Sequence, residues 1–399
     1  MSHDPVVLSA VRTPMGRHEG ALSGTRVDDL AAVVVAEAVA RSTVDPADIE
    51  EVVLGIVNAS GEAMGNLARF SALLAGLPTS VAGVSMNRYC GSGLSAVNAL
   101  AHEIAFGGAR IGVAGGAETM SRSTWPILKP RGSRYVGPIT ARDAMWSGAG
   151  GPQHPALEAD GTMIEMPEGA QFTAAQLGIT REEMDRFALE SHRRAAAAAD
   201  EGRFGDELVP LHLPDGSVFD ADETIRRDAS LEKLGGLKPY YPGCPDITPG
   251  NASPINDGAS ALVMAAADSV PDGVAPLARI VSTAVIGVEP REFSIGPVLA
   301  IRKLLERTGL SMDDIDLVEI NEAFAAQMLA CQRGLDLDPA RVNVNGGALA
   351  LGHALGNSGA RITVTLLHEM RRRGSRYGIA SACIGAGQGI ATLFEHGSA

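Results

Sequence analysis

An internal repeat constrains the fold of this 399-residue chain more than any other feature. When the sequence is shifted by 266 positions, nine of the twenty-three residues at 92–114 are identical without a gap. Average composition predicts roughly one or two such matches. The identities include Ser92-Gly93, which falls on Ser358-Gly359. A repeat of this size indicates two copies of one domain rather than a solenoid of short units.

Both copies show the same order of predicted helices and strands. Each copy contains a helix, an apolar strand, a glycine-rich turn, a second helix and a second apolar strand. These pairs are 27–41 with 296–308, 52–57 with 317–320, 93–106 with 359–373, and 111–114 with 377–383. Two further strand pairs are predicted at 6–10 with 278–288 and at 260–266 with 389–394. Apolar strands that alternate with helices indicate sheets covered on both faces. We therefore expect an α/β fold.

One long segment has no counterpart in the second copy. It contains a Pro/Gly-rich stretch at 125–155, a helix at 180–199 and a polar segment at 215–228. A long excursion from a rigid scaffold usually has a function, so we expect it to cover a site between the halves or to make subunit contacts. The predicted divisions are a first half at 1–122, the inserted loop domain at 123–253, a closing strand and helix of the first half at 254–276, and a second half at 277–399.

Composition and charge exclude several classes of function. Hydrophobic residues make up 45% of the chain and aromatic residues only 4%, which suits tightly packed α/β layers. The net charge of −14 argues against nucleic-acid or anionic membrane partners, because both select basic surfaces. No apolar run is long enough for membrane insertion, and residues 1–5 lack the features of a secretory signal. We predict a soluble, cytoplasmic protein that needs a local basic patch to bind an anionic ligand.

The four cysteines predict neither a disulfide framework nor a metal site. Cys90, Cys244, Cys331 and Cys383 are spread over a long chain, and none belongs to a CxxC or CxxH pair. Free cysteines are most often small buried core residues. However, Cys90 and Cys383 both lie in glycine-rich turns, where backbone amides are accessible to a ligand. They are therefore candidates for acyl-transfer chemistry.

Cys90 is the candidate nucleophile. It stands in the sequence Asn-Arg-Tyr-Cys-Gly-Ser-Gly, directly before the predicted helix at 93–106. A helix N-terminus favours negative charge, so we expect the pKa of this thiol to fall from roughly 8.5 into a range where thiolate exists at neutral pH. Gly91 and Gly93 allow a substrate to approach backbone N–H groups that stabilise a tetrahedral oxyanion.

Three further residues lie in comparable surroundings. His353 follows a glycine-rich run, and its near-neutral pKa suits a general base. Cys383 ends a predicted strand and begins the turn Cys-Ile-Gly-Ala-Gly, where a thiol can act as an acid or a base. Asn321 follows another predicted strand and can orient a water or a carbonyl group through its amide. The adjacent Glu322 is expected to cap the next helix.

Six motifs together make the sequence similar to the thiolase family over essentially its whole length. They are NRYCGSGLSAV from Asn87, GGAETMS from Gly115, GNASPINDGA from Gly250, NEAFA from Asn321, NVNGGALALGH from Asn343 and CIGAGQG from Cys383. The resemblance implies a five-layered αβαβα fold with two similar halves and an inserted loop domain. It also implies an acyltransferase that cleaves 3-ketoacyl-CoA with coenzyme A to acetyl-CoA and a shortened acyl-CoA, or catalyses the reverse Claisen condensation, through an acyl-cysteine.

The resemblance also assigns roles to individual residues. Cys90 corresponds to the nucleophile, and His353 to the histidine that activates it and forms an oxyanion hole with a water held by Asn321. Cys383 corresponds to the acid/base, and the backbone amides of Cys90 and Gly385 to a second oxyanion hole. Coenzyme A is implied as a substrate bound largely by the loop domain, with no permanent cofactor and no metal. The expected contacts to coenzyme A and the acyl group are Arg226, Ser253, Met166, Lys233, Leu234, Tyr241 and Phe324.

Several positions depart from the family pattern. Ala354 replaces the usual proline after the histidine, and Ala386 replaces a frequent glycine. Asn357 replaces a common alanine, and Glu165 replaces a histidine of short-chain biosynthetic members. We expect Ala354 to leave its turn less constrained and Glu165 to narrow the acyl pocket. The alternatives are a short-chain acetoacetyl-CoA thiolase, a decarboxylating ketosynthase, which Cys383 disfavours, and a CoA- or lipid-binding protein with little turnover. A role in fatty acid metabolism and a homodimer or homotetramer are also expected.

Overall fold

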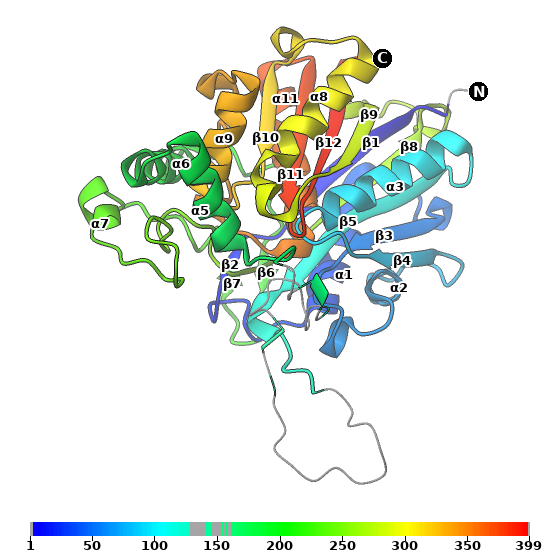
Figure 1. Ribbon diagram of the computed structural model, residues 1–399. Helices are drawn as coiled ribbons and strands as arrows, with labels where there is room; N and C mark the ends of the chain where they lie inside the picture. The colour runs from blue at the N-terminus through cyan, green and yellow to red at the C-terminus, as the bar shows by residue number, and fades with distance from the viewer. Residues whose placement is uncertain are drawn as a thin grey trace.

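Two half-sheets meet edge to edge in this protein, whose computed structural model describes residues 3–127, 141, 143–144, 154, 156–157 and 161–397. Across the molecule the strands follow the order β10 (Leu317–Ile320), β11 (Tyr377–Ile384), β12 (Gln388–Glu395), β9 (Ala278–Gly287), β1 (Pro5–Arg12), β8 (Asn256–Ala266), β5 (Ile111–Thr119), β3 (Glu51–Gly55) and β4 (Ala82–Met86), as Figure 1 shows. The short β2 (Gly16–Arg17) pairs with β8. The junction is the antiparallel pair of β1 and β9, which is narrow: only Val6 and Val7 pair across it, with Arg279 and Ala278.

The internal repeat reappears as one strand order read outward from this junction. It runs β1, β8, β5, β3 in the first half and β9, β12, β11, β10 in the second. Strands β5 and β11 begin 266 positions apart, as do β3 and β10. In each half the outermost pair of this set is parallel and the other two pairs are antiparallel. The prediction of two similar halves is confirmed.

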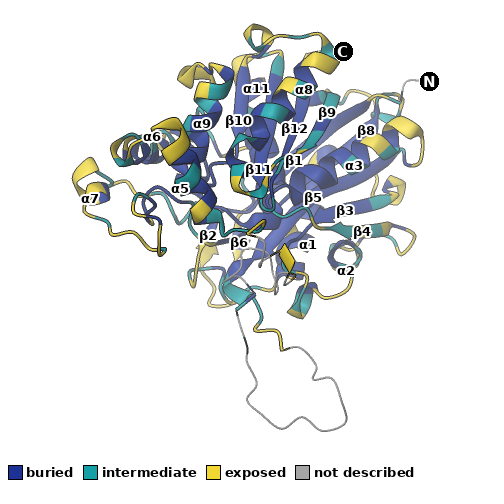
Figure 2. Cartoon of the chain, viewed as in Figure 1, coloured by how far each residue is buried: buried dark blue, intermediate teal, exposed yellow. Residues whose placement is uncertain are grey.

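Helices form three layers around the two half-sheets. On the outer face of the first half lie α1 (Val27–Ser42) and α2 (Leu67–Leu74), and on the outer face of the second lie α8 (Gly296–Thr308) and α9 (Ala325–Leu335). Between the half-sheets, α3 (Ser92–Phe106) packs against α11 (Leu355–Arg373). Figure 2 shows that the strands enclosed by these layers are buried. The predicted five-layered αβαβα fold is therefore confirmed.

The two central helices approach each other so closely that a residue with a Cβ atom would not fit at the point of contact. A Cβ atom on Gly93 would lie 2.6 Å from the backbone nitrogen of Ala360, and one on Gly359 would overlap the backbone nitrogen of Leu94. Gly93 and Gly359 are equivalent in the repeat, as are Leu94 and Ala360. The same contact is thus made twice, as expected for two halves related by a local two-fold axis.

Most predicted elements are confirmed, with differences at their ends. The predicted strand at 111–114 continues as β5 through Gly115 and Gly116, which resemble turn residues in the sequence. Both glycines lie within the strand because other backbone segments press against it. A Cβ on Gly115 would overlap the carbonyl oxygen of Ser260, and one on Gly116 would overlap that of Gly356.

The inserted segment packs beside the second half. Its described elements are α5 (Met166–Leu177), α6 (Arg181–Asp200), β6 (Leu211–His212), β7 (Val218–Phe219) and α7 (Leu231–Gly235). Figure 1 shows α5 and α6 next to α9. The predicted Pro/Gly-rich stretch at 125–155 lies largely outside the described residues. No helix among the described residues has the length and apolar character needed to span a membrane.

A buried ion-pair network joins this insertion to the first strand. Arg12 on β1 is fully buried, and its guanidinium lies 2.6 Å from a Glu207 oxygen and 2.7 Å from an Asp222 oxygen. Truncating one partner of a buried pair leaves an uncompensated charge in the interior. The insertion is therefore held to the central sheet by charge as well as by packing.

We predict that Gly359→Ala lowers the free energy of unfolding by about 1–3 kcal/mol, because the new methyl group must displace the α3 backbone. Urea denaturation of the variant measures this change. The matched control is Gly24→Ala, since nothing lies within 4 Å of a Cβ at that position. Equal stability of the two variants would show that the central helices separate without cost.

Candidate active site

Cys90 lies in a turn between β4 and α3 whose backbone is strained. Tyr89 has a φ of 45°, in the left-handed region that favours glycine. The side chain of Asn87 holds this turn, because its Oδ1 accepts a 2.9 Å hydrogen bond from the Tyr89 N–H and its Nδ2 donates to the Val57 carbonyl at 3.0 Å. Such backbone strain costs roughly 1–3 kcal/mol and is typical of functional sites. The turn fixes the thiol in an interior position.

Burial raises the pKa of Cys90 to about 11. The prediction that the helix N-terminus lowers this pKa is therefore wrong for the free enzyme. Removal from water outweighs the opposing hydrogen bonds from the backbone N–H groups of Gly385 and of Cys90 itself, and the charge of Glu118 raises the pKa further. A thiol with this pKa is protonated at neutral pH, so Cys90 can act as a nucleophile only if a base accepts its proton.

His353 is the base that the sequence predicts, and hydrogen bonds hold its ring in one tautomer. It precedes α11 and is 5% exposed. Its backbone N–H donates to Asn256 Oδ1 at 2.9 Å, and its Nδ1 lies 2.6 Å from Ser358 Oγ. The single hydroxyl hydrogen of Ser358 donates to the Ala354 carbonyl, so Ser358 Oγ accepts from the Nδ1–H group. Nε2 is then left unprotonated and able to accept a proton.

The surroundings of His353 keep the imidazole neutral. Burial, followed by the charge of Arg361, lowers the pKa of His353 to about 3. Arg361 is itself buried, and its three side-chain nitrogens have no hydrogen-bond partner in the described part of the chain. A cation close to an imidazole opposes the formation of imidazolium. The resting site therefore pairs a neutral thiol with a neutral base, and charge develops only as the thiol attacks.

Asn321 lies beside the His353 ring at the end of β10. Its Nδ2 is 3.5 Å from both ring nitrogens, which is long for a hydrogen bond. Its Oδ1 is buried and has no partner among the described residues. A buried amide oxygen without a partner is costly unless it accepts from a ligand or a water. This arrangement suits the predicted role of Asn321 in holding a water molecule.

Cys383 is the second-last residue of β11, is buried, and lies within electrostatic reach of Cys90. Burial holds its pKa well above the usual range, and the charge of Cys90 acts in the same direction. The following turn contacts the nucleophile, since the Gly385 N–H bonds to the Cys90 sulfur. Ala386 has a φ of 61°, which explains physically why glycine is frequent there. Cys383 thus interacts with Cys90, and Cys90 packs in one apolar cluster with Leu355, two residues after His353.

Four of the predicted substrate contacts lie next to Cys383. Met166, Tyr241 and Phe324 pack in the apolar cluster that contains its thiol. Ser253 is attached to the same cluster, because its N–H donates to the Ala323 carbonyl at 2.9 Å. The structure therefore groups Met166, Tyr241 and Phe324 with Cys383 and joins the Ser253 backbone to Ala323 of the same cluster.

The remaining predicted contacts lie on the insertion. Leu234 is buried, and its side chain limits the space at Gly250. Arg226 is exposed, with its N–H bonded to His192 Nδ1 at 3.1 Å. Lys233 is also exposed, and its ammonium group bonds to Asp228. Both cations are thus at the surface, and the charge of Lys233 is paired with Asp228.

Two expectations need correction or explanation. Glu322 does not cap α9, whose N-cap is Phe324. Instead it is buried and accepts hydrogen bonds from Ser191 Oγ at 2.6 Å, Asn343 Nδ2 at 2.9 Å and the Leu349 N–H at 3.1 Å. Glu322 therefore joins separate segments of the chain.

Ala354 has a φ of −74°, which a proline also adopts. The substitution therefore keeps the local backbone, and Asn256 holds the neighbouring histidine.

Three residues that position the site were not predicted from the sequence. Asn256 and Ser358 orient His353, as described above. Glu118 is buried at the end of β5 and accepts hydrogen bonds from the N–H groups of Val57, Asn58 and Gly356. Burial raises its pKa to about 7. The sequence does contain an indication of this role, because a carboxylate within an otherwise apolar strand needs buried N–H groups as hydrogen-bond donors.

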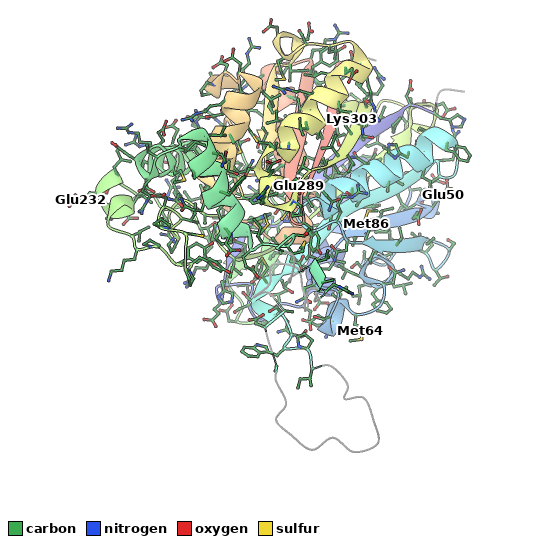
Figure 3. All side chains as sticks on the ribbon, in the orientation of Figure 1. Glu50, Met64, Met86, Glu232, Glu289 and Lys303 are labelled. Atoms are coloured by element: carbon green, nitrogen blue, oxygen red, sulfur yellow. The ribbon has the colours of Figure 1, made fainter. Side chains whose placement is uncertain are left out.

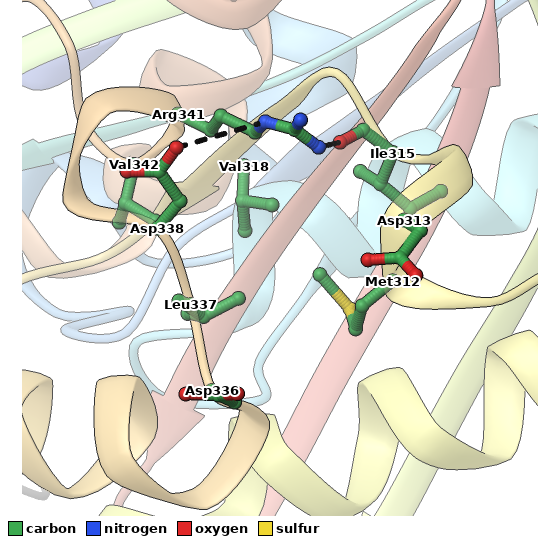
Figure 4. A pocket seen from close by; sticks show the side chains of 9 residues that line it. All are labelled: Met312, Asp313, Ile315, Val318, Asp336, Leu337, Asp338, Arg341 and Val342. Atoms are coloured by element: carbon green, nitrogen blue, oxygen red, sulfur yellow. Dashed lines mark hydrogen bonds and ion pairs between the residues drawn. The ribbon is translucent and has the colours of Figure 1, made fainter.

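A separate surface pocket of about 140 Å³ lies in the second half. Figure 4 shows Arg341 on one side of it, donating to the Ile315 carbonyl at 3.3 Å. The pocket is lined by Met312, Asp313, Ile315, Val318, Asp336, Leu337, Asp338, Arg341 and Val342. None of the predicted site residues contributes to it, so this pocket is not part of the candidate active site.

The architecture places the chain among enzymes with the five-layered αβαβα fold, and comparison with known proteins gives the family. The thiolase N-terminal domain matches residues 5–268, and the thiolase C-terminal domain matches residues 274–396. The chain therefore belongs to the thiolase family. The predictions of a thiolase and of an acyltransferase are confirmed.

Related proteins cover the full length of the chain. The β-ketoadipyl-CoA thiolase of Escherichia coli is 44% identical, over 98% of both chains. The crystal structure of the acetyl-CoA acetyltransferase of Bacillus anthracis superposes with a TM-score of 0.93 at 43% identity, covering 99% of each chain. Human mitochondrial 3-ketoacyl-CoA thiolase in complex with CoA gives 0.92 at 39% identity, covering 99% of this chain and 98% of that one.

Removing the Ser358 hydroxyl should free the His353 ring to turn and to change tautomer. We expect Ser358→Ala to lower kcat about a hundredfold, the scale of a misplaced general base, with little change in KM. Steady-state thiolysis measures both constants. Ser42→Ala is the control, because this buried hydroxyl bonds to the Val39 carbonyl on α1, away from the site. A parallel fall in both variants would point to general destabilisation.

The raised pKa of Cys90 predicts how the free enzyme reacts with iodoacetamide. Because only the thiolate is alkylated, the rate at Cys90 should rise about tenfold per pH unit between about pH 6 and about pH 9, with no plateau near neutrality. Mass spectrometry of the Cys90 peptide gives the rate, and Cys90→Ser gives the background from the other buried thiols. A plateau near pH 7 would reveal a preformed thiolate–imidazolium pair.

Proposed function

We propose that this thiolase cleaves 3-ketoacyl-CoA with coenzyme A, using Cys90 as the nucleophile. The observation that carries the proposal is that two buried thiols interact beside the Gly385 turn, while Cys90 packs in one apolar cluster with Leu355, two residues after the neutral imidazole of His353. An acyl-cysteine divides the transfer into two easier steps. The same groups operate in reverse for condensation, the direction in which an acetoacetyl-CoA synthase would work.

In the first step the Cys90 sulfur attacks the 3-keto carbon while its proton passes to His353 Nε2. The oxyanion of the tetrahedral intermediate accepts hydrogen bonds from the backbone N–H groups of Cys90 and Gly385. The protonated Nε2 of His353 and a water held by Asn321 donate instead to the thioester oxygen that carries the enolate charge. The carbon–carbon bond then breaks, which leaves an acyl group on Cys90 and the enolate of acetyl-CoA. The Cys383 thiol protonates the enolate carbon, and acetyl-CoA departs. The enzyme now holds an acyl-cysteine, a protonated His353 and a Cys383 thiolate.

In the second step the thiol of an incoming coenzyme A attacks the thioester. Its proton passes to the Cys383 thiolate, and backbone N–H groups of Cys90 and Gly385 stabilise the oxyanion. When the shortened acyl-CoA leaves, the Cys90 thiolate recovers its proton from His353. Both thiols and the imidazole return to their neutral starting forms, as their pKa shifts favour.

Coenzyme A is proposed to bind on the inserted segment at 123–253. Exposed Arg226 and Lys233 offer positive charge to its phosphates, while Ser253 and Leu234 border the path of the pantetheine chain. The acyl group is assigned to the apolar cluster of Met166, Tyr241 and Phe324, next to Cys383. Support also comes from the human mitochondrial relative, whose structure is described as a complex with CoA.

We also propose that the protein is a cytoplasmic homodimer or homotetramer of fatty acid metabolism. Strand β4 forms one edge of the sheet, and apolar side chains beside it are exposed, among them Phe70, Leu74 and Val84. Met64 and Met86 lie on the same side of the molecule (Figure 3). An exposed sheet edge with apolar neighbours favours pairing with a second chain.

Acetyl-CoA should acetylate Cys90, and only Cys90, when no second substrate is present. Mass spectrometry of the digested protein identifies the modified residue. Cys90→Ser should lose the acetyl group and lower turnover at least about a thousandfold, because a hydroxyl is a much weaker nucleophile at this site. Turnover that survives this substitution undiminished would end the proposal.

Substitution of the second thiol separates the two proposed roles. Cys383→Ser should still accept an acetyl group on Cys90 from acetyl-CoA, although more slowly, because the Cys383 thiol no longer protonates the departing CoA. It should fail to condense the acetyl group with a second acetyl-CoA, because no group then removes the proton from the α-carbon. Cys331→Ala is the control, since this buried thiol bonds to Gln327 and has no assigned role. Loss of condensation in both variants would argue against a specific function of Cys383.

A further inference from the structure

The hydroxyl of Ser92 bonds back to the turn that carries Cys90. Ser92 is the first residue of α3 and is fully buried. Its Oγ accepts a hydrogen bond from the Arg88 N–H at 2.8 Å and donates one to the Tyr89 carbonyl at 2.7 Å. A hydroxyl has one hydrogen to donate, and an N–H group can only donate, so these roles are fixed. The two bonds fasten the turn to the start of the helix.

This contact differs from a helix cap. A capping side chain accepts hydrogen bonds from the free N–H groups in the first turn of its own helix. Ser92 instead bonds to two backbone groups that precede α3, and the N-cap residue is Gly91, which has no side chain. Removal of the hydroxyl therefore leaves the N–H groups of α3 as they are. The group that it acts on is the preceding turn.

The Tyr89 carbonyl belongs to the same peptide unit as the Cys90 N–H. This unit is planar and trans, so its carbonyl and its N–H point in opposite directions. The bond from Ser92 to the carbonyl thus sets the direction of the Cys90 N–H, which bonds to the Cys90 sulfur. Such an anchor is needed, because the φ of 45° at Tyr89 is strained and persists only when its surroundings hold it.

Backbone contacts keep Ser92 itself in place. A Cβ on Gly55, at the end of β3, would lie 2.4 Å from the Ser92 carbonyl carbon. A Cβ on the next residue, Gly93, would lie 2.6 Å from the Ala360 nitrogen of α11. The backbone at 92–93 is thus enclosed by the end of β3 and by the second central helix. A hydroxyl on so rigid a support can hold a strained turn in one conformation.

The second half contains an equivalent arrangement. Ser358 lies 266 positions after Ser92 and is in the first turn of its own helix, α11. Its Oγ donates to the Ala354 carbonyl at 2.9 Å and lies 2.6 Å from His353 Nδ1. Arg88 and Ala354 are also equivalent in the repeat. Each serine therefore fastens the turn before its central helix, and these two turns carry the proposed nucleophile and the proposed base.

We propose that Ser92 is a positioning residue, whose hydroxyl holds the peptide between Tyr89 and Cys90 so that the Cys90 N–H faces the oxyanion of the tetrahedral intermediate. This inference rests on the proposed function. Ser92 acts through the backbone rather than on the substrate itself. Without its hydroxyl the peptide unit can turn, and the N–H donor then points away from the oxyanion.

Acetylation and alkylation of Cys90 separate this role from general support of the fold. Transfer of an acetyl group from acetyl-CoA to Cys90 passes through the oxyanion, whereas attack of Cys90 on iodoacetamide forms none. We expect Ser92→Ala, which adds no volume, to lower the acetylation rate about thirtyfold, less than the complete loss of an oxyanion donor costs. Alkylation at one fixed pH should stay within about threefold of wild type, because it depends on the thiolate. Mass spectrometry of the Cys90 peptide gives both rates.

Ser95→Ala is the matched control, because Ser95 is a buried serine on the same helix whose Oγ accepts from the side chain of Arg88 at 3.1 Å. It should keep both rates. Three results would overturn the inference while the proposed function stands: acetylation of Ser92→Ala at the wild-type rate, an equal loss in the two variants, or a matching change in acetylation and alkylation. A wild-type protein whose Cys90 takes no acetyl group would overturn the proposed function and this inference with it.

Discussion

The close contact between α3 and α11 is the constraint on which the rest of the structure depends. Gly93 and Gly359 allow the two backbones to approach within a distance that any Cβ would prevent. Each helix begins beside this contact. The turn before α3 carries Cys90, and the turn before α11 carries His353. One packing interaction therefore joins the two halves and sets the positions of the proposed nucleophile in one half and the proposed base in the other.

Burial gives this arrangement its chemical character. Loss of water makes ionisation unfavourable for all three reactive groups, so the thiols hold their protons and the imidazole lacks one. A free enzyme of this kind is protected from adventitious alkylation and oxidation, because reactive thiolate is scarce. The oriented N–H groups of Cys90 and Gly385 are nevertheless fixed in advance. They offer stabilisation to charge that appears on the substrate rather than on the resting enzyme.

The sequence predicts much of this molecule because the information is periodic or local. The repeat reveals the two halves, and the glycine-rich turns mark Cys90, His353 and Cys383. What it does not predict depends on tertiary contacts. The pKa of Cys90 follows desolvation rather than its position before a helix, and Gly115 and Gly116 belong to a strand because distant backbone segments press against them. The three partners of Glu118 come from two separate segments, 57–58 and Gly356, both distant in sequence, so no local pattern predicts them.

The buried ion pairs of Arg12 have a consequence for how freely thiolases can be recombined. This arginine belongs to the first strand, while both of its carboxylate partners belong to the inserted segment. A chimera that took its insertion from a relative without these acids would leave the guanidinium of Arg12 buried and unpaired. The insertion and the central sheet thus depend on each other's charges. An exchange of the insertion between family members must keep both the arginine of the first strand and its two carboxylate partners.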